Sequence, residues 1–186
     1  MQNSQSSALT HLELKDHRLH SILELTNAIN ANIAVEQLYR IFTFILKEQL
    51  HFSRFVLLFK QEDWLLPVKS GYKNKLVLNE VTSELSRFKE ITLVASSNSA
   101  ILQDFQAVIP IDHHDKPLAY LLLSTNSKTE ALELAHFSFA HTLTNILCVA
   151  LENRKLSAQN VIKEQISKEL ELASEMQKLL FPQELP

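Results

Sequence analysis

The sequence predicts an α+β fold, in which an antiparallel sheet is flanked by helices and followed by a long C-terminal helix. The apolar residues have helical spacing near the N-terminus, a β-type pattern in the middle, and helical spacing again to the end. Two pairs of β-rich segments are each joined by a short polar turn, as in hairpins. No proline or glycine lies between Thr129 and Phe181, so one helix can continue through that span.

Length and composition are those of an ordinary globular protein. The chain has 186 residues, of which 46% are hydrophobic and 21% charged, enough for one domain with a core and an extended element. The formal net charge of -3 gives no electrostatic reason to expect nucleic acid or an anionic membrane as a partner. The polar N-terminus has no apolar signal core. We therefore expect a cytoplasmic protein with no membrane segment.

Glycine and cysteine usage excludes several kinds of site. Gly71 is the only glycine, whereas phosphate-binding loops and dinucleotide fingerprints need several. A glycine-flanked serine elbow is excluded for the same reason. The single cysteine, Cys148, excludes a disulfide within the chain and any zinc site built from paired thiolates.

The elements are expected in the following order. Residues 1–10 form a disordered leader, and residues 11–151 form one domain that opens with helices at about 11–29 and 35–50. The almost continuously apolar run at 54–59 predicts a central strand, which pairs with a strand at 64–72 whose Pro67 indicates a sheet edge. A second hairpin has strands at 106–111 and 118–124. Between the hairpins we expect a strand near 76–78, a helix near 83–88, a strand at 91–95 and a helical turn starting at 96–99.

The last helix changes character along its length. From Thr129 it has apolar residues on two sides, but from Glu152 to the end, residues 152–186, it keeps a single narrow stripe. This spacing of three and four residues is typical of a coiled-coil seam. The stripe predicts a homodimer with parallel helices, and the alternative is a helix folded back on its own domain. The stripe consists of Ile162, Ile166, Leu170, Ala173, Met176 and Leu180.

The order of helix, helix, antiparallel sheet with small inserted helices, hairpin and long exit helix resembles a GAF domain. The segment NAINANIAVEQLYRIFTFILKEQLHFSRFVLLFKQED resembles the opening of that family, and FQAVIPIDHHDKPLAYLLLSTN resembles its closing hairpin. The resemblance covers about residues 15–151 and implies a regulatory sensor domain. A PAS domain is the nearest rival fold.

The C-terminal segment KELELASEMQKLLFPQELP resembles the sequence that leads into PPM/PP2C-type serine/threonine phosphatase domains of RsbU-like and sporulation stage II protein E-type regulators. The matching residues are Ala173, Met176, Gln177, Leu180, Phe181, Pro182 and Pro186. The resemblance implies that a catalytic domain, with its Mn or Mg ions, would follow Pro186. For these 186 residues we expect no enzymatic activity and no cofactor.

Polar clusters give weak candidates for chemistry. Asp112-His113-His114-Asp115 is the most metal-like group, but a short hairpin turn gathers few ligands, and we expect exposed turn residues without a metal. His136 and His141 are five residues apart, which does not stack them on a helix face. Cys148 is interpreted as a small core hydrophobe.

Aromatic residues on the predicted strands give the candidate ligand pocket, over the sheet where GAF ligands usually sit. The alternative is that they simply fill the core. These residues are Phe55, Phe59, Trp64, Phe105 and Tyr120.

Two functional hypotheses follow. The first is a sensor and dimerisation module that passes a signal through its C-terminal helix to a PP2C-type phosphatase. The second is a stand-alone small-molecule-binding GAF or PAS-like domain with a dimerisation helix and no attached enzyme. The residues encoded after Pro186 distinguish them.

Overall fold

The computed structural model describes the backbone of residues 2–94, 99, 101–113, 116–125 and 130–180, and the side chains of 16–94, 99, 101–113, 116–125 and 134–177. The chain divides into two compact units, 1–149 and 150–186, which are described separately. The predicted boundary at 151/152 lies two residues from this division. Helix α4, Glu130–Leu180, contributes residues to both units.

Three helical segments open the first unit. Helix α1 spans Gln2–Asn30, so residues 2–10 are helical where the sequence predicted a disordered leader. No proline or glycine interrupts them, and α1 simply continues. Helix α2 spans Val35–Phe44 and passes into a π-helical segment, η1, at Ile45–Gln49. Together these two fill the range predicted as one helix at 35–50.

Five strands form one antiparallel sheet in the order β2-β1-β5-β4-β3. Strands β1 and β5 lie inside the sheet and pair along most of their lengths, from Phe52↔Thr125 to Phe59↔Ala119. Strand β2 lies at one edge, as Pro67 predicted. The strands are β1 Phe52–Lys60, β2 Trp64–Ser70, β3 Thr92–Leu93, β4 Ala107–His113 and β5 Lys116–Thr125.

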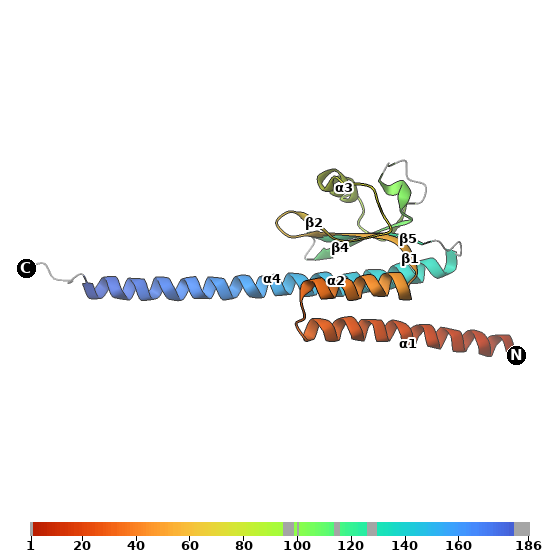
Figure 1. Cartoon of the computed structure of the whole chain (residues 1–186), viewed down its shortest axis with the longest axis horizontal. Helices are drawn as coiled ribbons and strands as arrows, with labels where there is room; N and C mark the ends of the chain where they lie inside the picture. Colours follow the sequence, from red (N-terminus) through yellow and green to blue (C-terminus); the bar gives the residue numbers. More distant parts are fainter. Residues whose placement is uncertain (1, 95–98, 100, 114–115, 126–129, 181–186) are drawn as a thin grey trace, which may run out of the picture. The chain divides into compact units, whose positions relative to one another are not determined.

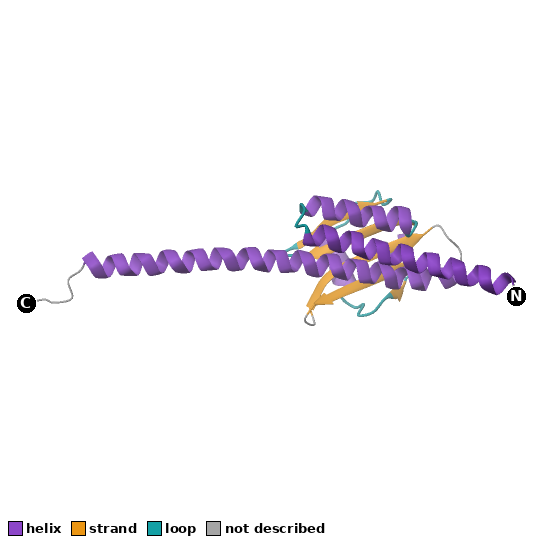
Figure 2. Cartoon of the chain, turned by 90° about the horizontal axis from the view of Figure 1, so that it is seen from below, coloured by secondary structure: helices purple, strands orange, loops and turns teal. Residues whose placement is uncertain are grey.

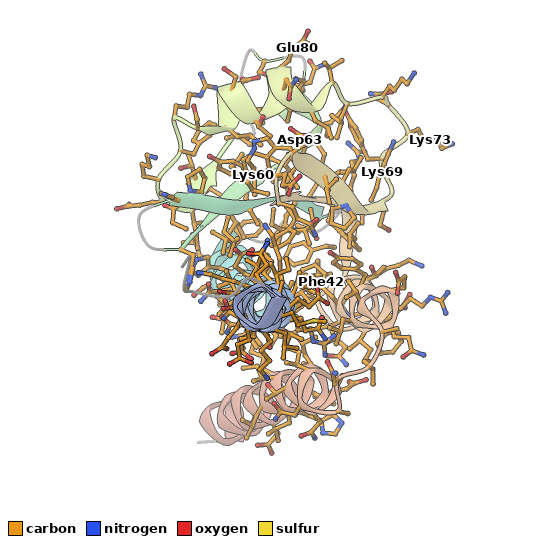
Figure 3. All side chains as sticks on the ribbon, turned by 90° about the vertical axis from the view of Figure 1, so that its left-hand side faces the viewer. Phe42, Lys60, Asp63, Lys69, Lys73 and Glu80 are labelled. Atoms are coloured by element: carbon orange, nitrogen blue, oxygen red, sulfur yellow. The ribbon has the colours of Figure 1, made fainter. Side chains whose placement is uncertain are left out.

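Helices cover both faces of the sheet (Figures 1 and 2). Helix α2 and the first part of α4 lie against one face, with α1 on their outer side, and α3 lies over the opposite face. Phe42 of α2 is fully buried between the helices and the sheet (Figure 3). Phe52 of β1 stacks on Phe137 of α4, with 5.8 Å between ring centroids. This layering confirms the predicted α+β class.

The segment between the hairpins differs most from expectation. Helix α3 spans Leu78–Leu85, where the sequence predicted a strand at 76–78 and a helix at 83–88. A short 3-10 helix, η2, follows at Leu102–Asp104. The residues 96–98 of the expected helix start lie outside the described part of the chain. Val81 and Leu85 of α3 are buried over the sheet, so tertiary packing rather than local propensity decides this segment.

Gly71 directly follows β2 and has a backbone φ of +67°. A Cβ atom at this position would lie 2.1 Å from the carbonyl oxygen of Ser53 in β1. Only glycine can therefore bring this chain segment so close to β1.

By length and composition alone, the segment Leu134–Gln177 of α4 could cross a membrane, a test that core helices of soluble proteins also pass. In the first unit its apolar side chains are used for packing, because Phe137, Ala140, Leu143 and Leu147 are fully buried. The absence of a membrane segment stays a prediction, and this burial supports it.

Candidate functional site

The five aromatic residues predicted to line a pocket lie on two faces of the sheet. Phe55 and Phe59 pair with Leu123 and Ala119 of β5, whereas the alternate residue Leu58 pairs with Tyr120. Successive side chains of a strand point to opposite faces, so Phe55 and Phe59 lie on the face opposite Tyr120. The predicted group therefore cannot line a single cavity.

The other three aromatic residues belong to the layer between the sheet and α3. Trp64 contacts Tyr120 with 5.3 Å between ring centroids, and Phe105 contacts Tyr72 with 5.1 Å. Apolar residues from the strands, α3 and η2 pack around them, among them Val56, Val81 and Leu102. Phe105 and Tyr120 are each about 1% exposed, so in this structure they fill space as core residues.

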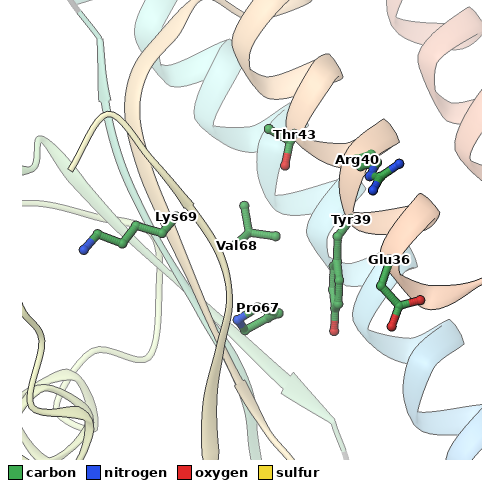
Figure 4. Close-up of a pocket in the computed structure, with 7 residues that line it drawn as sticks. All are labelled: Glu36, Tyr39, Arg40, Thr43, Pro67, Val68 and Lys69. Atoms are coloured by element: carbon green, nitrogen blue, oxygen red, sulfur yellow. The ribbon is translucent and has the colours of Figure 1, made fainter. Parts of the chain in front are cut away.

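A first cavity, of about 280 Å³, lies between α2 and the edge strand β2 (Figure 4). Strand β2 contributes residues from the proline-containing stretch that marks it as an edge strand, and α2 contributes one face of its helix. The lining residues are Glu36, Tyr39, Arg40, Thr43, Pro67, Val68 and Lys69.

Tyr39 is the most perturbed titratable group of this first cavity. Burial, with smaller contributions from Cys148 and Glu36, raises the pKa of Tyr39 to about 12. The phenol therefore stays protonated at neutral pH and can act only as a neutral hydrogen-bonding group. Glu36, Arg40 and Lys69 lie around this neutral phenol, so the first cavity offers a mixed surface of charged, polar and apolar groups for contact.

A second cavity, of about 310 Å³, lies where the end of β2 meets β1 and η2. Its walls are polar, which distinguishes it from the packed layer beside it. The lining residues are Arg54, Gly71, Tyr72, Lys73, Asn74 and Asp104.

Hydrogen bonds connect the walls of this second cavity. The Arg54 Nη1 donates to the backbone oxygen of Asp104 at 2.8 Å and lies 3.3 Å from its Oδ1, forming an ion pair. The Asn74 amide Nδ2 donates to the other carboxylate oxygen, Oδ2, at 3.3 Å. Lys69 Nζ donates to the Asn74 carbonyl at 2.9 Å. The network therefore joins three separate segments of the chain, β1, the end of β2 with the residues that follow it, and η2.

The histidine and cysteine candidates show no catalytic arrangement in the structure. Burial lowers the pKa of His136 and of His141, with Arg18 and His51 adding to the effect at His136. Burial also raises the pKa of the Cys148 thiol, which stays protonated and unreactive. His114 and Asp115 lie outside the described residues. Among the residues that are described, no three His, Cys, Asp or Glu side chains gather as metal ligands.

The predicted stripe of the second unit is exposed. The exposed fractions are 56% for Ile162, 52% for Ile166, 67% for Leu170 and 64% for Met176. Ala173 is exposed too, whereas the side chain of Leu180 lies outside the described residues. Val161 and Leu172 lie beside the stripe and are 53% and 60% exposed, which widens the apolar surface.

The sequence did not point to either cavity. Their charged residues, such as Arg54 and Asp104, lie far apart in the chain and form no motif. Gly71 could have drawn attention to the second cavity, because a lone glycine can stand where the backbone requires one.

A scan against protein-family models gives no match, and a sequence comparison with curated proteins gives none either. Solved structures do resemble the chain. The GAF domain of a putative sensor histidine kinase from Pseudomonas syringae pv. tomato aligns with a TM-score of 0.60 and 13% identity, over 84% of this chain and 99% of that one. The nlh2 GAF domain of A. aeolicus in an inactive state gives 0.55 and 14%, over 76% and 99%. The chain has a GAF-domain fold.

A further GAF domain, from the Acinetobacter phosphoenolpyruvate-protein phosphotransferase, aligns with a TM-score of 0.53 and 17% identity, over 75% of this chain and 95% of that one. The GAF fold was the one that the opening helices and the closing hairpin predicted. At these identities the likeness concerns the fold, and the role of the domain is argued from its own residues.

Proposed function

We propose that this protein is a sensory and dimerisation module whose C-terminal helix carries a signal to a PP2C-type serine/threonine phosphatase. The observation that carries the proposal is the exposed apolar stripe of the second unit. Four of its residues, Ile162, Ile166, Leu170 and Met176, are each more than half exposed and spaced as in a coiled-coil seam. Apolar side chains in this arrangement are stabilised when a second helix covers them.

The signalling mechanism is a change in how two such helices pair. An input that binds one arrangement of the dimer more tightly than another shifts the population between them. Rotation or register change of the paired helices then alters the position of whatever follows Leu180. The GAF fold supports a regulatory role for the first unit, since solved structures with a similar fold include a domain of a putative sensor histidine kinase.

The phosphatase part of the proposal rests on the resemblance of the residues around Ala173, Met176 and Leu180 to the segment that precedes PP2C-type domains. The residues encoded after Pro186 test it directly. An aspartate-rich metal-binding core is expected there, and its absence favours a stand-alone small-molecule-binding domain. That alternative is supported by the two cavities of the first unit.

Dimerisation is tested by replacing Ile166 and Leu170 with aspartate. Two carboxylates from each chain, four in the helix pair, are strongly unfavourable when buried, so the double variant is expected to be a folded monomer by light scattering while the wild type is a dimer. Lys168→Asp is the matched control, because it changes the net charge by the same amount on the opposite side of the helix. A wild type that is monomeric at high micromolar concentration would refute the homodimer.

A further inference from the structure

We propose that the cavity lined by Arg54, Lys73 and Asn74 binds a small anion that carries a carboxylate or phosphate group. The proposal goes beyond the proposed function, because neither the dimer nor the phosphatase depends on it. It is carried by the donors that line the cavity, by the balance of charge, and by the bonds that hold the lining residues in place.

Arg54 provides this cavity with hydrogen-bond donors that no described residue uses. Arg54 contacts Asp104 through Nη1 alone. Within the described part of the chain, its Nη2 and Nε donate no hydrogen bond, and a guanidinium has five N–H donors in all. The fork of Nη2 and Nε matches the two oxygens of a carboxylate or phosphate.

Positive charge exceeds negative charge at the lining. Asp104 balances Arg54 through their ion pair at 3.3 Å, but Lys73 forms no ion pair with any described residue. Lys69 adds a third cation near the rim, where it donates to the Asn74 carbonyl. Figure 3 shows Lys69 and Lys73 on the same side of the first unit. A ligand with negative charge is therefore favoured over a neutral or cationic one.

The lining is held in place before any ligand arrives. Gly71 packs on the backbone of Ser53, which fixes where the following residues lie relative to β1. Asp104 holds both Arg54 and Asn74, and it does so from a different segment of the chain. A site arranged in advance loses less conformational entropy on binding.

The size and exposure of the site limit the ligand. A cavity of about 310 Å³ accommodates a small molecule, but not a macromolecule. Arg54 and Lys73 are both reached by solvent, so their attraction for an anion is screened by salt. We therefore expect an affinity on the order of 0.1–1 mM, which weakens as ionic strength rises.

The test is titration of the whole chain with inorganic phosphate and, separately, with acetate, at constant ionic strength, followed by amide NMR shifts. Saturable shifts are expected at residues 71–74 and 104 with at least one anion, and the anion that saturates tells phosphate from carboxylate recognition. Lys73→Gln is expected to weaken the binding by about fivefold or more. Lys75→Gln, which removes the same charge beside the cavity, is expected to leave the affinity within about twofold.

The variant Asp104→Asn provides an independent test of the anion site. It removes the carboxylate that competes with the ligand for Arg54, while it keeps an acceptor oxygen. Tighter binding of the anion is expected. The proposal is wrong if neither anion gives saturable shifts, or if Lys73→Gln and Lys75→Gln weaken binding equally. Equal weakening would indicate an unspecific ionic effect.

Discussion

Single residues set the geometry around the second cavity, and Gly71 is the clearest case. Its φ of +67° and the 2.1 Å that would separate a Cβ atom from the Ser53 oxygen are both incompatible with a larger residue. Gly71→Ala is expected to lower the free energy of unfolding by at least about 2 kcal/mol, because the αL conformation and the clash act together. Urea denaturation measures this, with exposed Lys75→Ala as the control. An unfolding midpoint equal to that of the control would contradict this assignment.

The half-buried histidines predict how stability depends on pH. Burial lowers the pKa of His136 and His141 from the ordinary value of 6.5, so the folded state binds fewer protons than the unfolded chain below that pH. Their contribution to stability is complete above about pH 6.5 and is lost as the pH falls through the lowered pKa.

Denaturation about one pH unit above and one below 6.5 measures this effect. The double variant His136→Gln and His141→Gln is expected to lose less stability on acidification than the wild type does. Exchange of the exposed His17 and His20 for glutamine is the control. If all three proteins lose the same stability, the two histidines do not carry the effect.

At the scale of elements, α2 offers a matched comparison of burial. Phe42 is fully buried and Phe44, two residues along the same helix, is 52% exposed. Phe42→Ala is expected to cost about 3–5 kcal/mol in the free energy of unfolding, because it leaves a cavity between the helix and the sheet. Phe44→Ala is expected to cost less than about 1 kcal/mol. Guanidinium denaturation measures both, and similar costs would mean that α2 does not pack as described.

The elements also show what periodicity can predict. The run at Phe55–Phe59 predicted an inner strand because every residue in it is apolar, and β1 is buried along that run. The helix predicted at 83–88 lies instead at Leu78–Leu85, because that segment has mixed character and its helix is stabilised by packing of Val81 and Leu85 over the sheet. The helical state of residues 2–10 was missed because a polar composition resembles a disordered one.

At the scale of the whole chain, the fold class followed from the order of the elements, but the sites did not. The fold brings Arg54 of β1 beside Asp104 of η2, and nothing in the local sequence of either residue encodes that contact. The five predicted aromatic residues do not line one pocket, for a related reason. Successive side chains of β1 point to opposite faces of the sheet, which separates Phe55 and Phe59 from Tyr120. The C-terminal stripe was recognised because its spacing is local to one helix.

Parallel pairing of two copies through the stripe of residues 162–180 can be tested by cysteine cross-linking. Cys148 is fully buried, so a new cysteine would be the only reactive one among the residues described. In a parallel pair, equivalent stripe residues face each other at about 6 Å between Cα atoms, close enough for a disulfide. The variant Ile166→Cys is therefore expected to form a covalent dimer on mild oxidation, and Lys168→Cys is not. Equal cross-linking of the two variants, or none for Ile166→Cys, would show that the helices do not pair in parallel through this stripe.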